Sequence, residues 1–196
     1  MSDNILYIKI PMNRVGVLIG TYGKVKTTIE KKFQVNLKID GTTGNVWISP
    51  NQTTFDPIAF LKSRDIVMAI SRGFSPLKAY RLFNLDANLR IIDLRDIFGK
   101  GESDISRVKS RIIGKKGKTR RLLEEYTGVD VSVYGYTLSI IGNQNQIDIA
   151  KDAIERLIRG NQHKSVYNFL QRKRHKLKLG EMELWRDSNS VKPNNG

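Results

Sequence analysis

Two glycines three residues apart, set in a basic run, are the residues whose chemistry is easiest to name. Residues 111–121 read RIIGKKGKTRR, so two lysines separate Gly114 from Gly117. Glycine admits backbone dihedrals and close approaches that a Cβ would block. The amides that open the following helix attract anions. The run therefore predicts a turn that holds phosphate groups, with Lys115 and Lys116 as mobile cations.

A weaker copy of this turn lies 94 residues earlier. Residues 17–24 read VLIGTYGK, so Gly20 and Gly23 have the same spacing and are again entered by aliphatic residues and followed by a lysine. The likeness continues downstream, where the pattern of residues 29–39 matches that of residues 123–133. A repeat of this length indicates two copies of one domain.

The charge of the chain predicts a polyanionic partner. The formal net charge is +15, and residues 107–121 hold eight Lys or Arg and no acid. Such an excess favours nucleic acid or an anionic membrane surface. Residues 163–178 are the only loose candidate for the amphipathic helix that membrane adsorption would need. Adsorption also gives no reason to duplicate a glycine turn, so we prefer nucleic acid.

Residues that would support catalysis are sparse. The chain has no cysteine and two histidines, His163 and His175, both beyond the second copy. The phosphate-loop signature of nucleotide hydrolases is absent, since only two residues separate the glycines. Carboxylate pairs such as Asp93 with Asp96 could be metal ligands, but ion pairing on a helix surface explains them equally well. We expect no enzymatic activity, no metal and no cofactor. The absence of a signal peptide or an apolar span predicts a cytoplasmic protein.

Hydrophobic periodicity predicts the same order of elements in both copies: strand, helix, glycine turn, helix, strand, strand, helix. In the first copy the expected segments are a strand at 5–10, helices at 13–19 and 24–33, strands at 35–39 and 46–48, and a helix at 58–72. In the second they are a strand at 89–94, helices at 103–113 and 117–126, strands at 131–133 and 138–140, and a helix at 147–159. A short connecting helix is expected at 76–83, and a further helix from residue 163.

This order resembles the type I KH domain, and the sequence contains it twice. The resemblance implies an α+β fold with two tandem KH domains, each a three-stranded antiparallel sheet packed on three helices, and a C-terminal helix. In KH domains the G-x-x-G loop clamps the backbone of about four nucleotides while bases lie in an apolar groove beside it. The implied boundaries are a first domain at 4–74, a linker helix at 75–87, a second domain at 88–160, a basic helix at 161–179 and a flexible tail at 180–196.

Residue by residue, the resemblance assigns RNA binding to the two loops, their flanking cations and the groove beside them. In the second copy these residues are Arg107, Arg111, Ile113, Gly114, Lys115, Lys116, Gly117, Lys118, Arg120, Arg121, Val131 and Val133. In the first copy they are Gly20, Thr21, Tyr22, Gly23 and Lys24, with a groove floored by Ile19, Leu37 and Ile39.

Three segments resemble a narrower family, the two-KH ribosome-assembly factors known as partner of Nob one, in their archaeal form. They are residues 111–121, residues 131–135 (VSVYG) and residues 165–174 (SVYNFLQRKR); the resemblance covers about residues 5–178. It implies binding of single-stranded RNA near the 3′ end of the small-subunit ribosomal RNA precursor, assisting its maturation by the Nob endonuclease. Interaction with the alpha subunit of translation initiation factor two is a further family expectation.

The first loop departs from the pattern of a strong RNA clamp, because it has Thr21 and Tyr22 where such clamps usually have a basic residue. Tyr22 stacks on a base in one interpretation and rests on its own domain in the other. The second copy is therefore predicted to be the main RNA site, with a protein-scaffold role open for the first copy and the final helix. The alternative function is a generic KH protein of RNA decay or translation.

Overall fold

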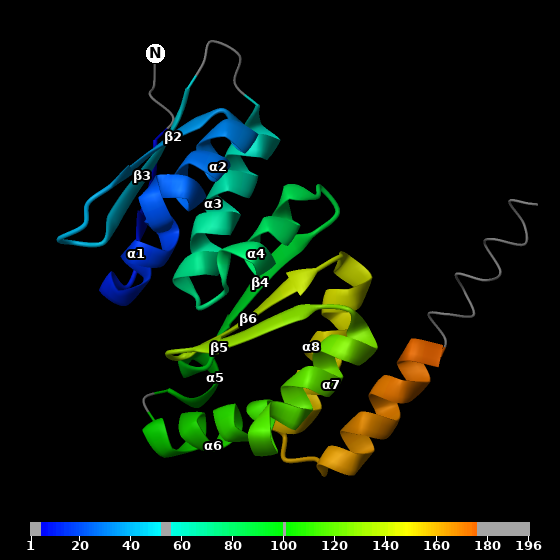
Figure 1. The fold of residues 1–196 in the computed structure, drawn as a ribbon. Coiled ribbons are helices and arrows are strands. Elements are labelled where there is room, and N and C mark those ends of the chain that lie inside the picture. The colour runs from blue at the N-terminus through cyan, green and yellow to red at the C-terminus, as the bar shows by residue number, and fades with distance from the viewer. Residues whose placement is uncertain (1–4, 52–55, 100, 176–196) are drawn as a thin grey trace, which may run out of the picture. The chain divides into compact units, whose positions relative to one another are not determined.

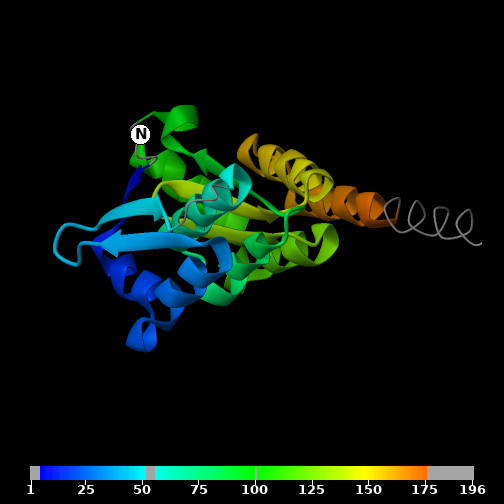
Figure 2. The same cartoon turned by 90° about the horizontal axis from the view of Figure 1, so that it is seen from above.

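The computed structural model describes residues 5–51, 56–99 and 101–175. Within these ranges the chain forms two three-stranded antiparallel sheets, with strand orders β1-β3-β2 and β4-β6-β5. Figure 1 shows the elements in chain order, and Figure 2 shows them from above. None of the described helices combines the length and the apolar character that a bilayer span requires.

The first repeat contains three strands, three long helices and the first glycine loop. Its elements are β1 (Leu6–Lys9), α1 (Met12–Ile19), the 3-10 turn η1 (Thr21–Gly23), α2 (Lys24–Phe33), β2 (Val35–Ile39), β3 (Asn45–Pro50) and α3 (Pro57–Ser71). A connection follows, made of α4 (Pro76–Ala79) and the 3-10 turn η2 (Tyr80–Phe83).

The second repeat has the same order with one added short helix. Its elements are β4 (Asn88–Asp93), α5 (Arg95–Phe98), α6 (Glu102–Ile113), the 3-10 turn η3 (Lys115–Gly117), α7 (Lys118–Thr127), β5 (Asp130–Tyr134), β6 (Thr137–Gly142) and α8 (Gln144–Ile158). A last helix begins at residue 163 and is described to residue 175.

The first sheet is buried on one face and open on the other. Along β2, Val35 and Leu37 are buried while Asn36 and Lys38 are exposed, the alternation expected of a half-buried strand. The buried positions of all three strands join a core with residues of α1, α2 and α3, and these three helices contact one another. The helices therefore cover one face, and the other remains at the surface (Figures 1 and 2).

The turn between β2 and β3 is held by one aspartate. The Asp40 carboxylate accepts hydrogen bonds from the hydroxyls of Thr42 and Thr43, both at 2.6 Å. The bond from Thr42, followed by that from Thr43, lowers the pKa of Asp40 below its usual range. These side-chain bonds add to the backbone bonds that close the turn, from the Asp40 amide to the Asn45 carbonyl at 2.9 Å and from the Gly44 amide to the Asp40 carbonyl at 3.0 Å.

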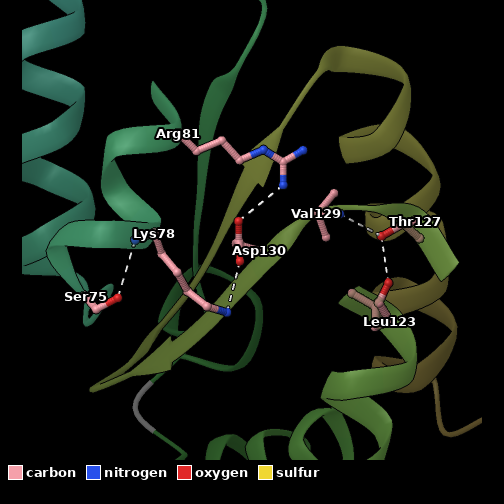
Figure 3. A network of polar contacts seen from close by, with 7 residues as sticks. All are labelled: Ser75, Lys78, Arg81, Leu123, Thr127, Val129 and Asp130. Atoms are coloured by element: carbon pink, nitrogen blue, oxygen red, sulfur yellow. Dashed lines mark hydrogen bonds and ion pairs between the residues drawn. The ribbon is translucent and has the colours of Figure 1, made fainter. Parts of the chain in front are cut away.

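The described residues fall into two compact units, those of 1–105 with 130–144 and those of 106–129 with 145–175. In the first unit the connection after α3 is joined to β5 by an ion cluster (Figure 3). The Asp130 carboxylate accepts from Lys78 at 3.0 Å and from Arg81 at 3.2 Å. The Ser75 hydroxyl caps α4 by accepting from the Lys78 amide at 3.4 Å. The connection after the first repeat is thus joined to the second sheet by ion pairs.

In the second unit, hydrogen bonds hold the C-terminal end of α7. The Thr127 hydroxyl donates to the Leu123 carbonyl at 2.7 Å and accepts from the Val129 amide at 3.4 Å (Figure 3). Gly128 ends the helix with a φ of 74°, in the left-handed region where glycine is favoured. Gly128 and the two Thr127 hydrogen bonds therefore end α7 and begin the link to β5.

An arginine fork joins the helix before the glycine loop to the last helix of the repeat, in both copies. The four hydrogen bonds are Arg14 Nε to Ile70 O at 2.7 Å, Arg14 Nη2 to Phe74 O at 2.5 Å, Arg111 Nε to Leu157 O at 3.0 Å and Arg111 Nη2 to Asn161 O at 2.5 Å. The last carbonyls of a helix lack intrahelical partners, and the negative end of its dipole lies there. Each fork places a cation at the end of the helix and donates to one carbonyl in its last turn, of Ile70 or Leu157, and to one three residues beyond its end, of Phe74 or Asn161.

The predicted order of elements and the α+β fold are confirmed, and three details differ. The connection at 76–83 is α4 followed by a 3-10 turn. The helix expected at 103–113 begins one residue earlier, at Glu102. Helix α5 was not predicted, because four residues are too few for a helical period; the Arg95 amide starts it by donating to Asp93 Oδ1 at 2.9 Å. The predicted tail at 180–196 and residues 176–179 lie outside the described residues.

Replacing either fork arginine with alanine should destabilise the protein, because a carbonyl in the last turn of the helix and one just beyond its end lose a charged donor. We expect Arg14→Ala and Arg111→Ala each to lower the free energy of unfolding by about 2–4 kcal/mol, from the cost of charge-assisted bonds. Urea denaturation followed by circular dichroism measures this. The control is Arg121→Ala, an exposed side chain whose removal should change stability by about 0.5 kcal/mol or less. Equal effects of all three variants would contradict a structural role for the forks.

Candidate nucleic-acid interface

The two glycine loops have nearly the same backbone conformation. From the first glycine onward the φ/ψ pairs are 72°/170° at Gly20 and 71°/174° at Gly114, 53°/31° at Tyr22 and Lys116, and 74°/7° at Gly23 and 74°/14° at Gly117. Every one of these φ values is positive. The weak sequence repeat is therefore a close structural repeat at the loop itself.

The first glycine of each loop is required for packing against the next helix. A Cβ on Gly114 would lie 2.1 Å from Thr119 Oγ1 and 2.9 Å from the Thr119 amide nitrogen. A Cβ on Gly20 would lie 2.4 Å from Val25 Cγ2. These separations are shorter than any side chain tolerates, so the loop and the first turn of the helix can meet only at glycine.

The second glycine of each loop faces open space. Nothing lies within 4 Å of the position a Cβ would take on Gly23 or Gly117, so a ligand can approach the backbone there. Both residues are the N-caps of the following helices, and neither α2 nor α7 has a side-chain cap or an acid in its first turn. The first amides of a helix lack intrahelical acceptors and attract anions. Each loop therefore presents a helix N-terminus without a side-chain cap, in which the first helical amide donates to a loop carbonyl; we call this an uncapped N-terminus.

Five exposed cations surround the second loop: Lys115, Lys116, Lys118, Arg120 and Arg121. We refer to them as the loop cations. Within the described part of the chain, no carboxylate lies within ion-pair distance of any of them. Their positive charge is thus available to a ligand from solution, and a flexible lysine costs little to redirect.

Two further predicted contacts, Arg107 and Arg111, differ from the loop cations. Arg107 is exposed on α6. Arg111 is partly buried, since its guanidinium forms the fork to the end of α8 and its carbonyl oxygen lies 3.0 Å from His163 Nε2. The side chain of Arg111 has structural partners in this conformation, so an RNA contact would have to replace them.

The first loop has the same backbone with different side chains. Tyr22 occupies the position of Lys116, and 96 % of its surface is exposed. The ring therefore does not rest on its own domain, which removes one of the two interpretations offered above. Thr21 and Lys24 are exposed as well. A large aromatic ring held in solvent beside an uncapped helix is suited to stacking on a base.

The predicted groove residues divide into core and surface positions. Leu37 and Val131 are only 2 % and 3 % exposed and belong to the interior, so they support the groove from below and cannot touch a base. Ile19, Ile39, Ile113 and Val133 are partly exposed. In the first repeat, Ile19 and Ile39 pack against the core, and the Leu37 amide donates to Glu30 Oε1 at 2.8 Å.

Sequence reasoning missed Thr119, which connects the second loop to the last helix. Its hydroxyl lies beside Gly114 and forms a hydrogen bond of 2.8 Å with the Tyr167 hydroxyl. The residue is buried, and it occupies the position that Val25 has in the first repeat. A hydroxyl in place of an aliphatic at an otherwise matching position was the signal that could have identified it.

Two family models match the chain, one on each repeat. The model described as "Krr1 KH1 domain" matches residues 5–85. The description "Eukaryotic type KH-domain (KH-domain type I)", the model of the second KH domain of PNO1 proteins, matches residues 88–175. Together with the repeated fold and loop geometry, these matches define a protein with two tandem KH domains.

Whole-chain relatives narrow the class. A KH domain-containing protein of Methanocaldococcus jannaschii is 46 % identical over 190 residues, which are 97 % of this chain and 83 % of that protein. The pre-rRNA-processing protein PNO1 of Debaryomyces hansenii is 26 % identical over 84 % of this chain and 65 % of that protein. The aDim2p chain from a crystal structure of an a/eIF2alpha–aDim2p–rRNA complex of Pyrococcus horikoshii is 49 % identical, with a TM-score of 0.82 over 90 % of this chain and 97 % of that one. The chain belongs to the PNO1 family of two-KH-domain ribosome assembly factors.

The two glycines of the second loop should respond differently to substitution. We expect Gly114→Ala to lower the free energy of unfolding by about 3 kcal/mol or more, because backbone strain is added to overlap with Thr119. Gly117→Ala adds only left-handed strain, and its expected cost is about 1–2 kcal/mol. Thermal unfolding of both variants measures the difference. If Gly117→Ala proved the more damaging, the division of roles between the two glycines would be wrong.

Proposed function

We propose that this protein is a non-catalytic ribosome assembly factor that binds single-stranded RNA near the 3′ end of the small-subunit ribosomal RNA precursor. Its second glycine loop holds the RNA, and the protein assists maturation of that end in the cytoplasm. The observation that carries the proposal is the second loop itself. It combines an open glycine, an uncapped helix N-terminus and five loop cations without carboxylate partners.

The features of the loop suit a phosphate backbone and do not depend on the identity of the base. Gly117 leaves room for a phosphate at the N-terminus of α7, where the amides and the helix dipole favour negative charge. Lys115 and Lys116 lie between the glycines and can reach the neighbouring phosphates. Lys116 is held at a φ of 53°, a conformation that costs a non-glycine residue on the order of 1–2 kcal/mol. Such strain at an exposed tip supports a functional role for the residue.

The comparisons support the RNA and one protein partner. The Pyrococcus horikoshii relative is in a complex with rRNA and a/eIF2alpha, and the Debaryomyces hansenii relative carries the name of a pre-rRNA-processing protein. We infer that this chain binds ribosomal RNA and the alpha subunit of translation initiation factor two. A Nob-type endonuclease, implied by the family resemblance, is the proposed partner for the cleavage that this protein does not perform.

The two KH domains have unequal roles in this proposal. We place the first domain at 4–74 and the second at 88–160, with the connection at 75–87 and the basic helix at 161–179. The second domain supplies the electrostatic clamp. The first repeats its backbone geometry but has Thr21 and Tyr22 in place of lysines, so we assign it a weaker contact, with Tyr22 stacked on a base. An exposed aromatic–base stack contributes about 1–3 kcal/mol, enough to orient a strand that the second domain already holds.

Reversing the charge of the second loop should abolish RNA binding. We expect Lys115→Asp with Lys116→Asp to remove detectable affinity for single-stranded RNA in fluorescence anisotropy, because the loop would repel phosphates. In the unsubstituted protein, neutralising about four phosphates corresponds to a log–log salt slope near −3. A slope near zero would exclude the electrostatic clamp.

The chain offers a matched control for this variant. Thr21→Asp with Tyr22→Asp places the same carboxylates on the same backbone in the first loop, and we expect it to weaken binding only modestly. The thermal midpoints of both variants should stay close to that of the parent, since all four side chains are exposed. Equal loss of binding in the two variants would contradict the ranking of the domains.

The position on the RNA is tested in cells. Ultraviolet crosslinking followed by sequencing should enrich the 3′ end of the small-subunit ribosomal RNA and its precursor. The Lys115→Asp, Lys116→Asp variant should lose that enrichment. Crosslinks scattered over messenger RNAs would instead support a generic KH protein of RNA decay or translation.

A further inference from the structure

A groove unrelated to either glycine loop lies in the first compact unit, between β1, α3 and β4. Its volume is about 560 Å³. Polar side chains from the three elements line it: Tyr7, Lys9, Arg64, Asp65, Arg72 and Arg90. β1 is an edge strand of the first sheet and β4 an edge strand of the second. We refer to this space as the cationic groove.

The charges of the cationic groove are unbalanced. Its one carboxylate, that of Asp65, already accepts from Arg64 Nε at 3.1 Å and Nη2 at 2.9 Å. In the described part of the chain no carboxylate lies within ion-pair distance of Lys9, Arg72 or Arg90; Asp93, which is paired with Arg95, is near enough to Arg72 for the arginine charge to contribute to its lowered pKa. Arg72 Nε is buried and has no hydrogen-bond partner among the described residues. A buried guanidinium donor without an acceptor is costly, and a bound anion lowers that cost by adding charge and acceptors around the same guanidinium.

A row of side chains with an aromatic centre continues from the groove across the open face of the first sheet. Tyr7 of β1 and Lys38 of β2 are both paired in register with Trp47 of β3. The Tyr7 and Trp47 rings are 6.0 Å apart, and Lys38 Nζ lies 5.7 Å from the Trp47 ring centre. Tyr7 is 57 % exposed, and its hydroxyl donates to Asn45 Oδ1 at 2.7 Å, so the ring is oriented but not covered.

Lys9 connects the two features. It lies two residues after Tyr7 on the same face of β1, and both residues line the groove. Cations next to an uncovered ring match a strand of RNA, in which each phosphate is followed by a flat base. An acidic protein segment would satisfy the cations but would leave the ring without a matching group.

We propose that the cationic groove and the Tyr7–Trp47–Lys38 row form a second contact for single-stranded RNA. Lys9, Arg72 and Arg90 neutralise phosphates in the groove, and Tyr7 stacks on a base. This contact depends on the proposed function only in that the chain binds RNA. It uses the β1 edge of the first sheet, whereas the KH groove of that domain lies along β2, the opposite edge.

The test uses the full chain and an oligouridylate of about 30 nucleotides, because backbone contacts do not depend on sequence. We expect Lys9→Glu with Arg90→Glu to weaken binding by about tenfold or more and to reduce the salt slope by about 1.4, the loss of two phosphate contacts. It should also abolish ultraviolet crosslinking of uridine to Tyr7, detected by mass spectrometry. The control, Lys31→Glu with Lys164→Glu, makes the same charge change on exposed helix positions and should leave the Tyr7 crosslink intact.

Each outcome separates this contact from the glycine loop. If the groove variant loses the Tyr7 crosslink but still binds RNA weakly through the second loop, while the charge-matched control keeps both, the second contact is supported. A groove variant with unchanged affinity and salt slope overturns the proposal and assigns the cations to an acidic protein partner. Should the groove variant fail to fold, Tyr7→Ala, on the open face, provides the second measurement; unaltered RNA affinity in that variant refutes the stacking.

Discussion

The loop that defines this protein depends on one close contact, between the first glycine of each loop and the helix that follows. Because a Cβ on Gly114 would overlap Thr119, only glycine allows helix α7 to begin so near the end of α6. That closeness fixes the position of the loop tip, and the N-terminus of α7 has no side-chain cap. The packing at the first glycine thus also creates a helix N-terminus that can bind an anion. The exposed side chains around it determine which anion binds.

Both repeats have this backbone, and their chemistry differs at two side chains. Tyr22 and Lys116 have the same φ and ψ, so either residue is projected from the same strained position into solvent. A lysine there attracts any phosphate at long range, whereas a tyrosine gains energy only after a base has arrived. In the proposed function, this difference lets one domain capture a strand and the other orient it.

The basic residues of the chain serve two purposes that their charge does not distinguish. Arg14 and Arg111 donate to carbonyls at and just beyond helix ends, and Lys78 and Arg81 form ion pairs with Asp130. Among the described residues, the loop cations and Lys9, Arg72 and Arg90 of the cationic groove lack such partners. A high net charge therefore overstates the RNA-binding surface, because a considerable part of it stabilises the fold. Arg111 illustrates this, since it belongs to the most basic window of the sequence yet forms a structural fork.

The sequence by itself determined the repeat, the order of the elements and the two glycine loops, because these depend on local spacing and period. It also led to the family that the relatives confirm. Tertiary structure decided which side chains remain available. Burial removed Leu37 and Val131 from the surface, the fork engaged Arg111, and the uncovered ring of Tyr22 became evident. Only folding brought β1, α3 and β4 together around unpaired cations, since contacts between residues distant in the chain leave no periodic signal in the sequence.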